Sequence, residues 1–140
     1  MLIQRRLVAI WVVLVLQAPV LGAAKAQDPH LGLTEYELSC MSCHGLDGHG
    51  DGPRAKTLKT TPADLTKIAK SNGGAFPAKK VTEVIDGRAT VAAHGQREMP
   101  VWGDRYRVRI TVSERSSMIE RRAHAQISAL VEYLRTIQEK

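Results

Sequence analysis

Both cysteines of this 140-residue chain lie in one five-residue run, Cys40-Met41-Ser42-Cys43-His44. The pattern C-x-x-C-H is the attachment site of a c-type haem. Two thiols three residues apart can each form a thioether to one of two neighbouring vinyl groups, and His44 then offers its imidazole to the iron. The run therefore predicts one covalently attached haem c, held by Cys40 and Cys43, with His44 as the proximal ligand.

Three other roles for this run compete with haem attachment. An exported chain with two cysteines can form a disulfide, and a thioredoxin-like redox pair also uses C-x-x-C, in a βαβ context. No apolar strand precedes Cys40. A zinc site needs four ligands, and the adjacent side chains of Cys43 and His44 do not easily reach one tetrahedral ion. The sequence favours haem over all three.

The first 26 residues have the order of a secretory signal peptide. Arg5 and Arg6 precede an unbroken apolar run over 7–16, and Ala24-Lys25-Ala26 places small residues two apart. We expect cleavage after Ala26, leaving a domain of residues 27–140 in the periplasm. An uncleaved leader would instead anchor the domain, although polar and helix-breaking residues interrupt the apolar span that an anchor needs.

The part of the chain after this leader contains little apolar material. Loss of Arg5, Arg6 and Lys25 lowers the net charge from +6 to +3, a weak attraction for a nucleic acid. Leu, Ile, Val and Phe are 22 of the 114 residues in 27–140, near the lower limit for a folding chain. A domain of this size buries roughly 60–70% of its unfolded surface. We therefore expect the cofactor to complete the core.

Capping and hydrophobic patterns predict four helical segments. The first runs from the Thr34–Glu37 capping box to about Cys43, and the second from Thr61-Pro62-Ala63-Asp64 to Asn72-Gly73-Gly74. The third covers Ala78–Asp86 and is stopped by Gly87, and the fourth runs from the Ser117–Glu120 capping box to Ile137. Residues 45–60, which hold four glycines and Pro53, and residues 89–103 are predicted loops. Residues 106–112 alternate apolar and polar side chains, which predicts a short β-hairpin or edge strand.

The second predicted loop carries the favoured sixth ligand of the iron, Met99. Its thioether is flanked by Pro100, and the competing interpretation is a methionine that fills a gap in the core. His94 is the best alternative, because imidazole also suits iron. Met118, at a helix start, and His49, close to the haem motif, are weaker alternatives.

From about Gly32 to Ile137 the chain resembles class I c-type cytochromes of the bacterial periplasmic kind. The resemblance is carried by the haem motif followed by Gly45, by the glycine-rich run 47–52, and by Met99-Pro100-Val101-Trp102-Gly103. It implies an all-α cytochrome c fold of three to four helices around one haem, with the C-terminal helix crossing the N-terminal one. It also implies His44/Met99 ligation, with a proline carbonyl accepting a hydrogen bond from the proximal histidine. Pro62 is favoured over Pro53 for that carbonyl.

Trp102 and Arg88 are predicted neighbours of the haem propionates. An indole N–H or a guanidinium group can donate a hydrogen bond to a carboxylate, and Arg does so as a planar fork. The competing interpretations are a Trp that packs against the ring and an Arg that is simply solvated.

The resemblance implies a one-electron carrier rather than an enzyme, because two ligands leave the iron no open position and no acid/base pair accompanies the motif. Expected partners are a periplasmic dehydrogenase or quinol-oxidising complex as donor and a terminal oxidase or reductase as acceptor, with a monomer when free. The alternatives are an electron-transfer subunit fixed to one oxidoreductase, and a haem enzyme or gas sensor with a labile distal ligand.

Residues 105–122 hold six arginines against Glu114 and Glu120, which indicates either a solvated face or a docking surface for an acidic partner.

Overall fold

Helices account for the regular structure of the computed structural model, which describes residues 29–89, 99–109 and 116–139. The α-helices are α1 (Pro29–Ser39), α2 (Met41–His44), α3 (Ala78–Asp86), α4 (Trp102–Arg109) and α5 (Ser116–Thr136). One-turn 3-10 helices lie between α2 and α3, namely η1 (Ala55–Thr57), η2 (Leu65–Lys67) and η3 (Lys70–Asn72). The described ranges form no strand, so the predicted all-α fold is confirmed. The predicted leader lies outside them, and no helix within them is long and apolar enough to cross a membrane.

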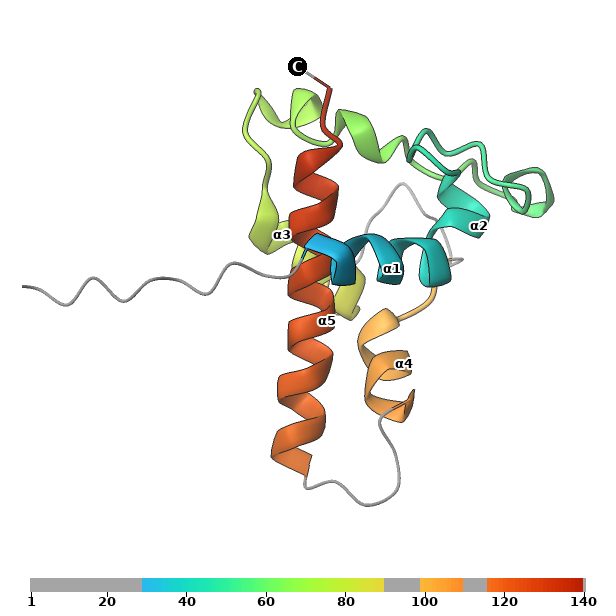
Figure 1. Cartoon of the computed structure of the whole chain (residues 1–140). Helices are drawn as coiled ribbons and strands as arrows, with labels where there is room; N and C mark the ends of the chain where they lie inside the picture. Colours follow the sequence, from blue (N-terminus) through green and yellow to red (C-terminus); the bar gives the residue numbers. More distant parts are fainter. Residues whose placement is uncertain (1–28, 90–98, 110–115, 140) are drawn as a thin grey trace, which may run out of the picture.

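The crossing of α1 over α5 forms the centre of the fold (Figure 1). A Cβ atom at Gly32 would lie under 3.0 Å from the backbone of Ala129 and from Cβ of Tyr133, so only glycine permits this approach. One turn further along α1, the ring of Tyr36 packs on the ring of Tyr133 with 5.1 Å between centroids. The expected crossing of the N-terminal and C-terminal helices is therefore confirmed, and Tyr36 and Tyr133 pack it.

The helix α5 carries the apolar face against which the other helices pack. Its buried side chains recur every three or four residues, as the helical periodicity predicted: Ala123, Ile127, Leu130 and Leu134. Helix α3 packs on it through Val81 and Ile85. Gly87 ends α3 in the left-handed conformation, with its N–H bonded to the carbonyls of the last turn. The predicted bounds of this helix are confirmed.

The predicted strand near 106–112 is wrong over 106–109, where the chain forms the last half of α4. Trp102 and Tyr106 are four residues apart and share the buried face of that helix, with ring centroids 6.1 Å apart. Val108, the next apolar residue in the alternation, is exposed. Residues 110–112 lie outside the described residues. The alternation was too short to distinguish a strand from a helix with one buried pair of aromatic rings.

Two predicted capping boxes are also wrong. The first helix already includes Pro29, which places Thr34 and Glu37 on the exposed side of its interior. The last helix already includes Ser116, and Glu120 pairs with Arg107 of α4. In the first helix, the contact of Gly32 with α5 favours a helix longer than the local signal predicts.

The segment after Pro62 is less helical than predicted. It forms only η2 and η3, and Asp64 caps η2 by accepting a hydrogen bond from the backbone N–H of Thr66. Gly73, in the left-handed conformation, ends η3 as predicted. The chain between α2 and α3 therefore wraps one end of α5 mostly as irregular backbone (Figure 1).

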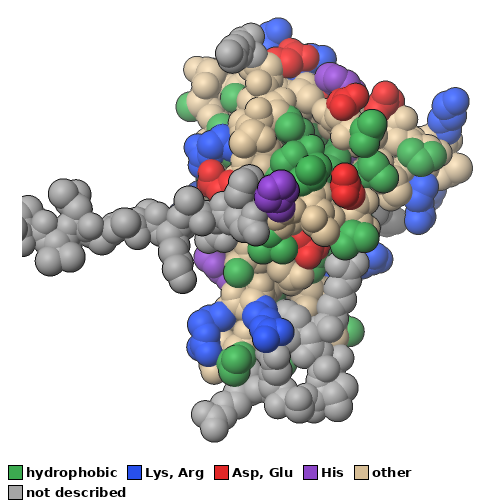
Figure 2. All heavy atoms as spheres, in the orientation of Figure 1, with side chains coloured by type: hydrophobic (Ala, Val, Ile, Leu, Met, Phe, Trp, Pro, Cys, Tyr) green, Lys and Arg blue, Asp and Glu red, His purple; other side chains and the backbone are tan. Residues whose placement is uncertain are grey.

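Charged side chains are unevenly distributed over the face shown in Figure 2. Apolar and acidic side chains lie together over the α1 region, whereas Lys and Arg side chains lie around the margins and near the start of α5. This mixed surface is consistent with a small net charge.

We predict that Gly32→Ala destabilises the protein. An alanine in a helix normally gains about 1 kcal/mol over glycine, but the new methyl group would collide with the Ala129 carbonyl and force α1 away from α5. We expect a net loss of about 1–3 kcal/mol in the free energy of unfolding, measured with denaturant. Thr34→Ala, on the exposed side of α1, is the matched control and should be neutral. An unchanged stability of Gly32→Ala would show that the two helices are not in close contact.

Candidate functional site

Six of the seven predicted site residues line one cavity between α2, α4 and the η2 segment. They are Cys40, Cys43, His44, Pro62, Met99 and Trp102. Ser39, Leu58, Thr60 and Pro100 complete the lining, and most of the cavity surface is apolar. The structure therefore brings together residues that are up to 62 positions apart in the sequence, from Cys40 to Trp102.

A second cavity, of about 350 Å³, lies against α3 and α5. Its apolar walls include Ile68, Val81, Val84, Ile85 and Leu134. His44 and Met99 line this cavity as well as the first. A cavity this large is within the range of cofactor sites. A flat, mostly apolar group lying between His44 and Met99 would fill both cavities, so the donor set and the shape of the site fit haem.

The two cysteines present free thiols at the start and in the last turn of α2. Cys40 is buried at the junction of α1 and α2, and Cys43 is half-buried in the last turn of α2. Burial, together with the charges of Glu35 and Cys43, raises the pKa of the Cys40 thiol to about 12. The thiol is therefore protonated at neutral pH. Both cysteines line the cavity, which agrees with the predicted attachment.

The imidazole of His44 is oriented by a backbone hydrogen bond. Its Nδ1–H donates to the carbonyl oxygen of Ala63 over 2.9 Å, which leaves the lone pair on Nε2 for a metal. The prediction that Pro62 supplies this carbonyl is therefore wrong by one residue. Pro62 is buried and lines the cavity. Its own carbonyl oxygen points at Gly50 instead, so that a Cβ atom on Gly50 would lie under 3.0 Å from this oxygen.

The loop after the haem motif folds back onto it through the backbone. Gly50 N–H donates to the His44 carbonyl over 2.8 Å, and Gly52 N–H donates to the Cys43 carbonyl over 3.1 Å. A side chain on Gly52 would meet the backbone of Ser42 and Cys43. The hydroxyl of Tyr36 donates to the Gly45 carbonyl over 2.6 Å inside the core. These bonds fix the proximal side of the site before any cofactor contact is considered.

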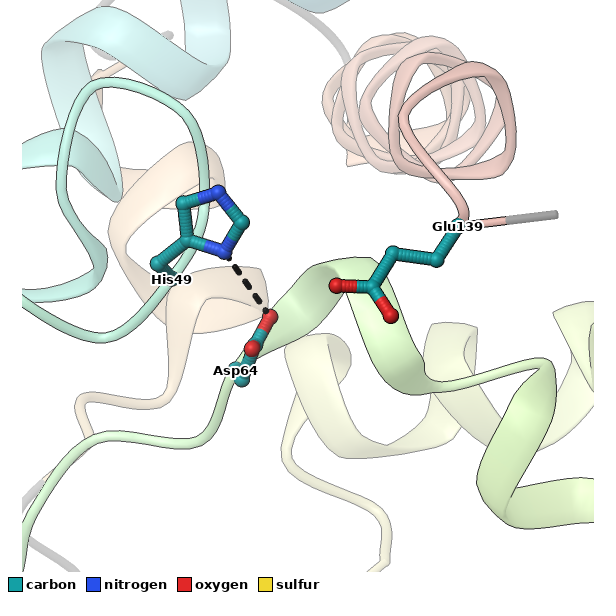
Figure 3. Close-up of side chains that lie close together, drawn as sticks. All are labelled: His49, Asp64 and Glu139. Atoms are coloured by element: carbon teal, nitrogen blue, oxygen red, sulfur yellow. Dashed lines mark ion pairs between the residues drawn. The ribbon is translucent and has the colours of Figure 1, made fainter.

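A cluster of charged side chains ties this loop to η2 and to the C-terminal end of the chain (Figure 3). His49 Nδ1 lies 3.5 Å from Asp64 Oδ1, and Glu139 approaches the same place from the residues after α5. Lys67 Nζ lies 2.6 Å from Asp64 and 3.6 Å from Glu139. The ammonium group of Lys67 thus supplies the positive charge between the two carboxylates, and the cluster is an ion-pair contact. It sits directly after Ala63, whose carbonyl orients His44.

Arg88 does not line the cavity that holds the other predicted residues. Its Nε lies 2.5 Å from Asp86 Oδ2, at the end of α3, so the predicted contact with a haem propionate finds no support in its position. Trp102 is buried and lines the cavity, with the Arg105 guanidinium 5.0 Å from its ring centroid.

The alternative sixth ligands lie in different places. His49 is exposed in the charged cluster, and Met118 is 40% exposed near the start of α5. His94 lies outside the described residues. Of the candidates that the structure describes, Met99, His49 and Met118, only Met99 lines the cavities beside His44.

Sequence reasoning missed the apolar wall of the second cavity and the orienting role of Ala63. Val81, Val84 and Ile85 recur at helical spacing within Ala78–Asp86, and such spacing predicts a buried face but not the partner that covers it. Every residue has a backbone carbonyl, so side-chain identity does not show which one accepts the hydrogen bond from His44. The resemblance could point only to a proline nearby.

The comparisons with known proteins give one match. A family model described as Cytochrome c matches residues 30–138 of the chain. No curated protein and no solved structure gives a significant match.

We predict that Tyr36→Phe destabilises the haem-loaded protein. The variant keeps the ring stack but leaves the buried Gly45 carbonyl without its donor, at an expected cost of about 1–3 kcal/mol. Tyr133→Phe, which alters the other ring of the same stack, is the control and should cost less. Denaturant unfolding of both variants measures the difference. Equal effects would mean that the hydroxyl of Tyr36 contributes no more than that of Tyr133.

We also predict a change in acid stability for Asp64→Ala. Partial burial pushes the pKa of the Asp64 carboxyl upward, but hydrogen bonds from Lys67 and Thr66 outweigh it and hold this pKa below its usual range. A lowered pKa in the folded state contributes stability that is present above about pH 4 and is lost as the pH falls further. The variant should lose about 0.5–2 kcal/mol at neutral pH, as expected for a missing cap. Its stability should also fall less steeply below pH 4.

The matched control for Asp64→Ala is Glu132→Ala, which breaks an exposed pair with Arg135 on α5. Exposed pairs contribute about 0–1 kcal/mol, so this variant should keep the parental acid profile. Thermal unfolding between pH 2 and 7 compares the three proteins. Parallel profiles for Asp64→Ala and the parent would contradict the role assigned to Asp64.

Proposed function

Because the chain belongs to the cytochrome c family, we propose that it is a periplasmic one-electron carrier whose haem iron is ligated by His44 and Met99. The family establishes haem-based electron transfer, with haem c covalently attached through the two cysteines, Cys40 and Cys43. When bound, the haem iron takes up and releases one electron. The proposal adds the two ligands, the compartment and the role as a carrier.

The observation that carries the ligand assignment is the shared lining of the two cavities. His44 and Met99 come from separate parts of the chain and are both in contact with both cavities. The Ala63 carbonyl holds the imidazole in one orientation, and Pro100 follows the thioether directly. Two such ligands leave the iron without an open position for a substrate. This supports a carrier rather than an enzyme.

The chain's own residues then control how the electron passes. Apolar side chains of α3 and α5 exclude water from one side of the site, which favours fast transfer because little solvent has to reorganise. Trp102 lines the other cavity, and the Arg105 guanidinium lies over its ring. A positive group at this place favours encounter with an acidic partner.

The proposed partners follow from the compartment. The leader pattern of residues 1–26 supports export, and a periplasmic carrier receives electrons from a dehydrogenase or a quinol-oxidising complex and delivers them to a terminal oxidase or reductase. Arg121 and Arg122 add two basic side chains in the first two turns of α5.

Carbon monoxide tests the ligand assignment directly. The reduced, haem-loaded protein should keep its low-spin spectrum under carbon monoxide, whereas Met99→Ala should form the carbon monoxide complex at once, because a ligand position is then open. Met118→Ala is the matched control, since it removes a methionine that lines neither cavity. Prompt reaction of the parent would support an enzyme or sensor, and an inert Met99→Ala that becomes reactive only with His94→Ala would assign the ligand to His94.

A further inference from the structure

Arg107 of α4 connects three helices through its guanidinium group. Its Nη2 lies 3.1 Å from Oδ1 of Asp86, the last residue of α3. Its Nε lies 2.8 Å from Oε1 of Glu120 on α5, and Nη1 lies 3.5 Å from Asp104 on α4 itself. The two outer contacts differ in environment, because the Asp86 side chain is 7% exposed whereas that of Glu120 is 60% exposed. The pair with Asp86 is therefore the buried one.

Asp86 is also in direct contact with the first turn of α4. A Cβ atom at Gly103 would lie under 3.0 Å from Oδ1 and from the carbonyl oxygen of Asp86, so only glycine allows the approach. The carboxylate thus lies at the amino-terminal end of α4, where the helix dipole favours a negative charge. Arg88 supplies a second guanidinium group to the same carboxylate. A buried carboxylate held in this way binds the end of α3 to the start of α4.

The start of α4 determines where Met99 can lie. Met99 is three residues before Trp102, the first residue of α4, and three residues span at most about 11 Å. Met99 and Trp102 line the same cavity, while Val81 and Ile85 of α3 line the other cavity together with Met99. The contact between α3 and α4 therefore sets the position of the thioether relative to the apolar wall that faces it.

We propose that Asp86 and Arg107 are positioning residues for the sixth ligand, and that their ion pair sets how firmly Met99 is held at the haem iron. This inference rests on the proposed function, because it takes Met99 as that ligand. The pair between Arg107 and Glu120 joins α4 to α5, and Glu120 lines neither of the two cavities. It contributes to stability without positioning Met99.

The test compares two substitutions that each remove one acidic partner of Arg107. Asp86→Asn and Glu120→Gln have the same charge change and nearly the same shape as the parent side chains. In the reduced, haem-loaded protein, Asp86→Asn should form the carbon monoxide complex on the order of tenfold faster than the parent, because more of the protein has Met99 released. Glu120→Gln should react at the parental rate. Met99→Ala gives the highest rate of carbon monoxide binding, because no Met99 has to be released.

Thermal unfolding is measured on the same samples. A purely structural role predicts a lower Tm for both variants and no difference in their reaction with carbon monoxide, and this result would overturn the proposal. If Asp86→Asn does not fold, Arg107→Gln breaks the same pair from the other side and should react faster than Glu120→Gln. Reaction of Arg107→Gln at the rate of Glu120→Gln would equally overturn it.

The controls separate this inference from the proposed function. If Met99→Ala reacts no faster than the parent, Met99 is not the sixth ligand and the ligand assignment itself fails. If Met99→Ala reacts and Asp86→Asn does not, the ligand assignment holds and only the role of the ion pair is wrong. A double variant, Asp86→Asn with Arg107→Gln, should react more slowly than the two single effects would give together, because both changes remove the same Asp86–Arg107 pair.

Discussion

The close crossing of α1 and α5 is the contact on which the position of the haem motif depends. Gly32 lets the two backbones touch, and the stacked rings of Tyr36 and Tyr133 fix how α1 lies on α5. Because α1 runs directly into Cys40 and α2, this orientation also determines where the thiols and the imidazole lie. The hydroxyl of Tyr36 extends the same contact into the loop after the motif. A single crossing thus places both the attachment residues and the proximal ligand.

The two cavities explain how a chain with few apolar side chains can form a core, because a cofactor can supply the missing apolar surface. Side chains of α3, α5 and the η2–η3 segment line the larger one, a cavity of about 350 Å³. Burial of apolar area is worth roughly 25 cal/mol per Å², so a large ring filling this space would contribute as much as several core side chains. The haem is therefore part of the core as well as the redox group, and its loss should loosen α3 and α4 before the α1–α5 crossing.

Local signals predicted what depends on a few neighbouring residues. The spacing of Cys40, Cys43 and His44 is set by one helical turn, and the bounds of α3 follow from its apolar face and Gly87. The prediction failed where distant parts decide. Arg88 pairs with Asp86, because the contact of Asp86 with Gly103 of α4 helps to bury this carboxylate and a buried carboxylate needs a partner. The alternation in 106–109 concealed a helix, because Trp102 and Tyr106 face the core together only when α4 packs on α5.

The two sides of the site are built in different ways. On the proximal side, His44 is held by Ala63 and by a loop whose backbone returns to the motif within ten residues. On the distal side, Met99 is not part of a helix, and its position depends on contacts between α3, α4 and α5 that are far apart in the sequence. Irregular backbone of this kind opens in local unfolding at a lower free energy than well-packed helices do. A partner that presses on α4 would therefore act on the proposed sixth ligand while leaving His44 and the two cysteines in place.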